Sequence, residues 1–254
     1  MASGVYCGWD VRDGATPIPG LYVAGDGAFG DMAEGVIYPF IGSTSTNCSV
    51  QGNMAGAAAA AYADTVEIVD LPADQVEAAT SEIFAPRELT KGWDPNYVVD
   101  RLLGIMSAPE IQLAKDGVAL NAALTQVEYL RDKVVPKMMG YCGHDLRYVL
   151  EAKHKVFSAE MKLRASLARE ETRGTHYRSD FPFRDDANFL CHLGAHKAED
   201  GSMAISKIEI PDSWKGDLSL DYATRYPGRF PGEAEAMGLA TEEQQTSGAY
   251  EHTA

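Results

Sequence analysis

Two short runs between positions 20 and 46 have the residue types of a ligand-binding site. The first, Gly25-Asp26-Gly27, directly follows four apolar residues that predict a strand over 21–24. The second, residues 42–46, precedes a run of small residues that predicts a helix through Ala61. An acidic side chain at the end of a strand is well placed to bind sugar hydroxyls, and the free amides of a helix N-terminus favour an anionic ligand edge. The pattern therefore indicates a site made by an acidic turn and a helix end.

These residues resemble the last flavin-contacting segment of the fumarate reductase/succinate dehydrogenase flavoprotein superfamily. Members of this superfamily carry a GLYAAGE strand and turn, followed by a glycine–serine turn at a helix start. Residues 20–26 match the first element, with Asp26 where the family usually has Glu, and residues 42–45 match the second. The resemblance implies an FAD cofactor and a set of flavin contacts: Gly4, Gly25, Asp26, Gly42, Ser43, Thr44 and Ser45.

The same stretch departs from the dicarboxylate-reducing members of the superfamily. Those members place an arginine two residues before the glycine of the second element, whereas this chain has Phe40 there and no Arg or Lys in residues 20–62. Fumarate or succinate is therefore not the expected substrate. Tyr38-Pro39, with Gly42 after them, instead resembles the ketosteroid-dehydrogenase branch. That resemblance implies that the Tyr38 hydroxyl and the Gly42 amide polarise a substrate ketone, and the alternative is that Tyr38 only packs.

A second motif occupies residues 168–182 and continues to Asp185-Asp186. It resembles the ARxESRGAHYRxDFPxRDD element that ends the helical domain of the same superfamily. Its charged side chains are expected to form a paired network that attaches the helical domain to the flavin domain. His176 lies within it, and we expect this residue either to titrate near neutrality as a catalytic proton shuttle or to serve as a structural, hydrogen-bonded histidine.

The only GxGxxG spacing in the sequence, residues 25–30, does not open a βαβ unit, so it is not the fingerprint that binds the dinucleotide half of FAD. We therefore expect a Rossmann-containing flavoprotein subunit to complete the cofactor site in a hetero-oligomer, with a small-molecule substrate and an electron-transfer protein as further partners. Two alternatives stay open at this stage. In the first alternative the chain is a non-catalytic docking subunit, and in the second it is a part of one long reductase.

Composition excludes several classes of function. The 254 residues carry a formal net charge of −15, which argues against nucleic acid as a partner. No apolar run reaches the roughly 18 residues of a membrane span. The four cysteines are scattered without a CxxC pair, which predicts free thiols in a reducing cytoplasm and no metal or cluster site.

The predicted fold is an α/β fragment, in which strands and one helix complete a Rossmann-like FAD-binding domain, followed by an α-helical bundle and an extended C-terminal arm. The expected parts are residues 1–68 (flavin domain), 69–93 (linker), 94–195 (helical domain) and 196–254 (strand and arm). Periodicity predicts a short strand at 66–69, helices at 74–83, 94–106, 113–130 and 145–171, and a strand at 204–210, with a break near 115–117.

Overall fold

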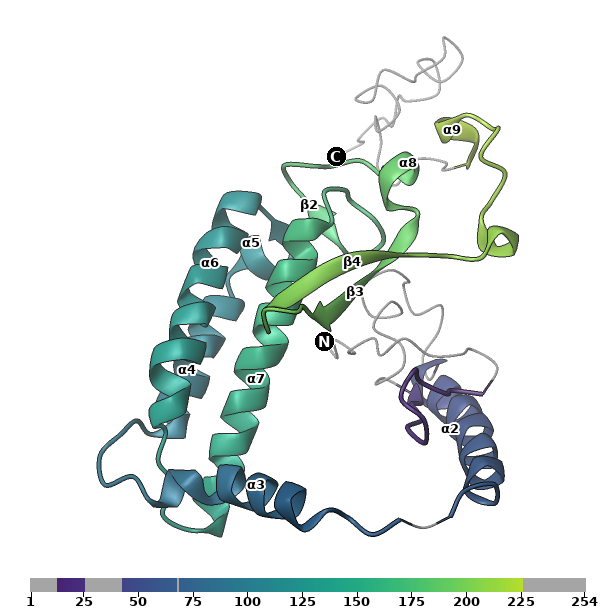
Figure 1. The fold of residues 1–254 in the computed structure, drawn as a ribbon. Helices are drawn as coiled ribbons and strands as arrows, with labels where there is room; N and C mark the ends of the chain where they lie inside the picture. Colours follow the sequence, from purple (N-terminus) through teal and green to yellow (C-terminus); the bar gives the residue numbers. More distant parts are fainter. Residues whose placement is uncertain (1–12, 26–42, 68, 226–254) are drawn as a thin grey trace.

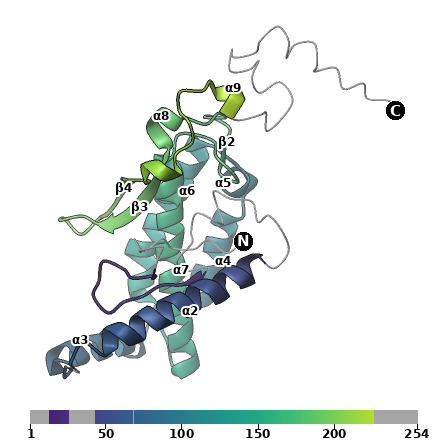
Figure 2. The same ribbon diagram turned by 90° about the vertical axis from the view of Figure 1, so that its right-hand side faces the viewer.

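The computed structural model describes residues 13–25, 43–67 and 69–225, and its centre is a bundle of three helices (Figures 1 and 2). The bundle consists of α4 (Pro95–Met106), α6 (Gly117–Tyr129) and α7 (Gly143–Ala168). These helices lie side by side along most of their length. The prediction of a helical bundle in this part of the chain is therefore confirmed.

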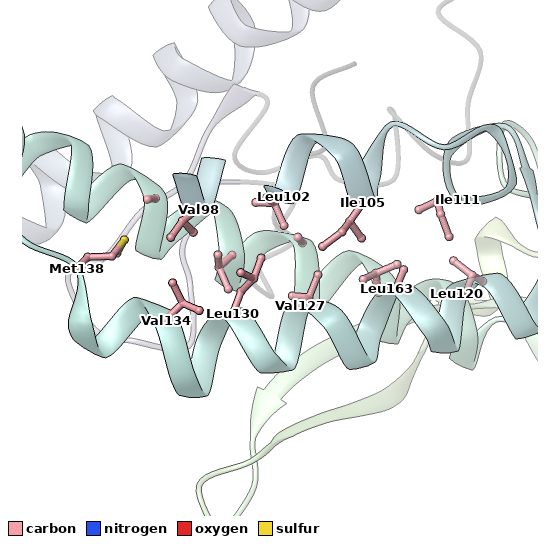
Figure 3. Close-up of a cluster of buried hydrophobic side chains, with 14 of the residues drawn as sticks. Val98, Leu102, Ile105, Ile111, Leu120, Val127, Leu130, Val134, Met138 and Leu163 are labelled. Carbon is pink, nitrogen blue, oxygen red and sulfur yellow. The ribbon is translucent and has the colours of Figure 1, made fainter. Parts of the chain in front are cut away.

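The bundle core follows the apolar spacing of its helices. One stripe of α4 contributes Val98, Leu102 and Ile105, whose spacing of three and four residues places them on one helical face. Figure 3 shows them facing the apolar side chains of α6 and the turn after it. The remaining buried apolar members are Ile111, Leu120, Ala123, Val127, Leu130, Val134, Met138, Val149, Ala152, Val156, Ala159 and Leu163.

Helix α4 starts where the sequence predicts, whereas α6 starts at Gly117, four residues after the predicted start, and an aspartate caps each helix. The Asp94 carboxylate accepts the Asn96 amide at 2.8 Å, just before Pro95. The Asp116 carboxylate accepts the Val118 amide at 2.9 Å. Each cap satisfies amides that have no partner within the helix. The predicted break near residues 115–117 is this cap.

The far end of α6 continues into two irregular helical turns. A π-helical turn, Leu130–Val134, leads into a 3-10 turn, Val135–Lys137. Arg131 in the π-helical turn forms an ion pair with Glu160 of α7, whose side chain is 1% exposed. Arg164 donates to the same carboxylate at 2.8 Å. These two partners allow a carboxylate to be buried in the bundle, since a buried charge requires compensation.

The sheets of the described residues are small. Strand β1 (Ala114–Lys115) pairs in parallel with β2 (Tyr177–Arg178), and β3 (Cys191–Lys197) pairs antiparallel with β4 (Met203–Glu209). The predicted strand at 204–210 is confirmed as β4, within one residue at each end. Its partner β3 was not predicted.

The segment before the bundle contains α2 (Ser43–Ala63), lying apart from the bundle in Figure 1, and α3 (Ala73–Phe84) at its base. Helix α3 confirms the prediction at 74–83. The predicted strand at 66–69 is wrong for residues 66, 67 and 69, because Val66 and Val69 are exposed and no strand of the described residues pairs with them. The strand expected at 21–24 is reduced to one bridge between Tyr22 and Ala15.

Short helices complete the described chain: α5 (Pro109–Gln112), η2 (Ala85–Arg87), α8 (Asp186–Phe189), η5 (Asp212–Trp214) and α9 (Tyr222–Arg225). Within the described ranges, no helix combines the length and the apolar character needed to cross a membrane.

Candidate functional site

Residues 13–25 form a turn that lies along one face of α2. Gly14 adopts φ +73°, and a Cβ there would lie 2.9 Å from the Cβ of Ala55. Nearer the helix start, Gly25 adopts φ +67°, and its amide donates to Oε1 of Gln51 at 2.8 Å. A Cβ at Gly25 would lie 2.9 Å from Sγ of Cys48. Both glycines are required by close contact and by the left-handed backbone that other residues rarely adopt.

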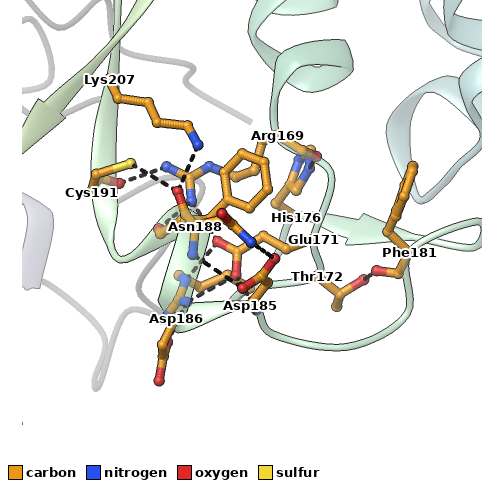
Figure 4. A network of polar contacts seen from close by, with 12 residues as sticks. Arg169, Glu171, Thr172, His176, Phe181, Asp185, Asp186, Asn188, Cys191 and Lys207 are labelled. Atoms are coloured by element: carbon orange, nitrogen blue, oxygen red, sulfur yellow. Dashed lines mark hydrogen bonds and ion pairs between the residues drawn. The ribbon is translucent and has the colours of Figure 1, made fainter. Parts of the chain in front are cut away.

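A second group of polar residues gathers beyond the C-terminal end of α7, around the carboxylate of Glu171 (Figure 4). This side chain is fully buried and accepts from Nη1 of Arg169 at 2.5 Å and from Nε and Nη2 of Arg173 at 2.8 and 2.9 Å. The backbone amide of Asp185 donates to it at 2.9 Å. Four hydrogen bonds and two guanidinium groups thus compensate one buried charge.

The Glu171 network reaches α8, β3 and α9. Arg173 also pairs with Asp186 at 2.6 Å, and Arg225 of α9 pairs with the other oxygen of Asp186. Arg169 donates to the carbonyl oxygens of Phe189 and Cys191 at 3.1 and 2.8 Å. The network therefore joins the end of α7 to the hairpin that follows. Its expected attachment to the first 68 residues stays a prediction.

The side chain of Arg178, in strand β2, caps the C-terminal end of α7. This side chain is 2% exposed, and Nη1 donates to the carbonyl oxygens of Ser166, Leu167 and Arg169 at 2.7, 3.3 and 3.2 Å. Nε and Nη2 each donate to one carboxylate oxygen of Asp180 at 2.7 Å. The guanidinium thus satisfies carbonyls that a helix end leaves without partners. Helix α7 consequently ends at Ala168, three residues before the predicted end.

His176 lies buried beside this cap, 3% exposed, and its Nε2 donates to the Arg169 carbonyl oxygen at 3.2 Å. Burial, reinforced by the neighbouring charges of Lys115, Arg169 and Arg178, lowers the pKa of His176 to about 3. This pKa argues against titration of His176 near neutrality, and its role as a catalytic proton shuttle stays a prediction. The alternative of a structural, hydrogen-bonded histidine agrees with this geometry.

The buried neutral His176 predicts an acid-dependent loss of stability. The unfolded chain binds a proton on this side chain below a pKa of about 6.5, whereas the folded chain binds it only near pH 3, so stability falls as the pH drops from about 6.5 toward 3. We expect about 2 kcal/mol of this loss between pH 7.5 and pH 5, measured by urea unfolding. His176→Gln should flatten that difference. Substitution of the exposed His154 by Gln should leave it unchanged, and an equal slope in both variants would contradict the assignment.

Comparison with known proteins places this geometry in context. Residues 102–218 match the family model described as the C-terminal part of fumarate reductase flavoproteins. The fumarate reductase flavoprotein subunit of Mycobacterium tuberculosis strain H37Rv is 30% identical over 211 residues, which is 78% of this chain and 35% of that protein. The resemblance to the fumarate reductase/succinate dehydrogenase flavoprotein superfamily is confirmed.

Two further proteins are similar to this chain. The fumarate reductase flavoprotein subunit of Haemophilus influenzae is 25% identical over 208 residues, 78% of this chain and 34% of that protein. The solved Mycobacterium smegmatis Sdh1 complex in the apo form shares the fold with a TM-score of 0.71 at 20% identity, over 95% of this chain and 40% of that one. The chain spans about a third of the length of the curated relatives it matches.

The predicted flavin-contacting residues fall partly within the described ranges. Gly25 lies against α2 and residues 43–45 are the first three of that helix, and their flavin contacts stay predictions. The predicted contacts Gly4, Asp26 and Gly42 and the predicted catalytic Tyr38 lie outside the described residues. The sequence prediction missed Gln51. The available signal was a large polar side chain among small residues, three positions after Cys48. Within the described ranges, no three His, Cys, Asp or Glu side chains group as metal ligands.

Proposed function

We propose that this chain forms the C-terminal part of an FAD-dependent oxidoreductase. The carrying observation is the turn ending at Gly25, which contacts Cys48 and Gln51 in the first half of α2. The superfamily relationship over residues 102–218 supports the same conclusion. When bound, FAD supplies hydride transfer between its N5 atom and a substrate carbon near a carbonyl or a C=C bond.

The chain's own residues fit an FAD molecule at this place. Gly25, with no side chain and a left-handed backbone, lets the chain approach α2 closely, and Asp26 follows it directly to bind ribityl hydroxyls. The amides of residues 42–45, at the N-terminus of α2, bind the anionic edge of the flavin pyrimidine. The Tyr38 hydroxyl and the Gly42 amide polarise the substrate ketone.

The proposal includes a partner that carries the Rossmann half of the FAD site, because the adenosine pyrophosphate needs a βαβ turn that the sequence lacks. Helix α2 supports this part of the proposal. Its Gly52 and Gly56 face open space in the described residues, with nothing within 4 Å of an added Cβ. An electron-transfer protein and a small-molecule substrate complete the proposed assembly. The cytoplasmic location proposed for it is supported by the scattered cysteines, which form no CxxC pair in the sequence.

The test is purification of the native complex that contains this chain, followed by identification of its subunits and its visible absorbance. We expect the complex to contain a Rossmann-containing flavoprotein segment and to show a flavin-type absorbance spectrum. Denaturation should release the bound flavin, which we expect to be FAD. A stable complex that holds no flavin would overturn the proposal and favour a docking role.

The Tyr38 hydroxyl has the strongest predicted effect on turnover. We expect Tyr38→Phe to lower turnover roughly 100-fold on a substrate whose C=C bond is conjugated to a ketone, because an oxyanion donor contributes about that much. Flavin content should stay at the wild-type level. Tyr129→Phe, at an exposed position of α6, is the matched control. Unchanged turnover in Tyr38→Phe would leave this tyrosine a packing role only.

A further inference from the structure

We propose that Gln51 is a positioning residue for the flavin, acting through the turn that it holds on α2. The inference rests on the proposed function and adds to it a residue that lies outside every flavin-contacting motif of the chain. Its basis is the hydrogen bond from the Gly25 amide to Oε1 of Gln51, at 2.8 Å and half-buried.

This hydrogen bond replaces a partner that the backbone does not supply. The turn is closed by backbone bonds at its other end, where the Thr16 amide donates to Leu21 and the Val23 amide donates to Gly14. The Gly25 amide lies past the last of these bonds, and it bonds to a side chain of α2 instead. A half-buried amide needs an acceptor, so the carboxamide fixes where the chain leaves the turn.

The position of Gln51 along α2 gives this bond its significance. Gln51 lies eight residues after Ser43, the first residue of the helix, which corresponds to about 12 Å along the axis. Cys48, which a Cβ at Gly25 would meet at 2.9 Å, lies one turn earlier on the same face. One side chain thus sets where Gly25, the last described residue before Asp26, lies along α2 relative to the N-terminus of that helix.

The acceptor oxygen and the length of the side chain are the two requirements, and substitutions separate them. Gln51→Leu removes the acceptor, whereas Gln51→Asn keeps a carboxamide that is one methylene shorter. Gln51→Glu keeps both the length and an acceptor oxygen. Gln75→Leu makes the same chemical change at an exposed position of α3 and is the matched control.

The experiment measures the FAD dissociation constant and the flavin absorption maximum of the complete complex for each variant. We expect Gln51→Leu and Gln51→Asn to weaken FAD binding roughly tenfold and to shift the absorption maximum, because an amide of the turn loses its acceptor. Gln51→Glu should stay within about threefold of wild type, and Gln75→Leu should equal it.

Two results would overturn the inference alone. In the first, a wild-type complex binds FAD and both Gln51→Leu and Gln51→Asn bind it equally well. In the second, Gln51→Glu loses as much affinity as Gln51→Leu, which would show that an acceptor oxygen at this position does not position the turn. A wild-type complex that binds no FAD would overturn the proposed function, and this inference with it.

Discussion

Glu171→Gln is expected to lower the free energy of unfolding by about 3–5 kcal/mol, the loss typical of removing one partner from a buried charge network. The carboxylate is fully buried and accepts from Arg169, from Arg173 and from a backbone amide. The neutral amide has nearly the same shape, so the loss reports charge compensation and not a cavity. In the variant, the guanidinium groups of Arg169 and Arg173 stay mostly buried without the negative charge of Glu171.

The neighbouring Glu170 provides the control, because it is exposed and undergoes the same change of charge. Glu170→Gln should change the unfolding free energy by less than about 0.5 kcal/mol. Urea unfolding of the full chain at pH 7.5, followed by far-ultraviolet circular dichroism, measures both variants. Equal unfolding free energies for the two variants would show that the network around Glu171 contributes little.

Arg178→Met is the second substitution with a large expected effect, about 3–5 kcal/mol of unfolding free energy. It removes the bonds to the carbonyls at the end of α7 and leaves Asp180 without the guanidinium that lowers its pKa. Arg178→Lys retains the charge but not the planar fork, so it should recover only part of the loss.

Arg147→Met is the matched control for this substitution, since Arg147 is exposed and its pair with Glu151 spans 3.5 Å on the surface of α7. Surface pairs of this kind contribute about 0.3–0.5 kcal/mol. The same urea titration distinguishes the positions. Full recovery by Arg178→Lys would mean that charge alone, without the geometry of the fork, ends the helix.

The parts of the fold that sequence predicts well are those determined locally. The start of α4 at Pro95 and the break before α6 each follow from an aspartate cap within three residues of the helix. The end of α7 depends on Arg178, which comes from a strand ten residues later, so periodicity alone placed it too late. Strand β1 has two residues and pairs with residues 63 positions away, and no local pattern indicates such a pairing.

In the candidate site, too, the locally determined features can be predicted from the sequence and the features that depend on distant residues cannot. The glycine–aspartate turn and the helix start are readable because backbone geometry restricts their residue types, and Gly25 adopts the left-handed backbone, φ +67°, that glycine permits. The protonation state of His176 depends on burial by residues 169–178 and on Lys115 across the β1–β2 pair, which spacing does not reveal. Gln51 was missed because one hydrogen bond across 26 residues determines its importance.

The parallel pairing of β1 with β2 also bears on the order in which the chain acquires its structure. The pairing closes a loop of 63 residues for only two residue pairs, so its entropic cost is recovered only after α6 and α7 already lie together. We therefore infer that β2 docks after the folding transition state has been crossed. Substitutions at Arg178 should then accelerate unfolding while folding rates hardly change, which would make this small contact a determinant of kinetic lifetime.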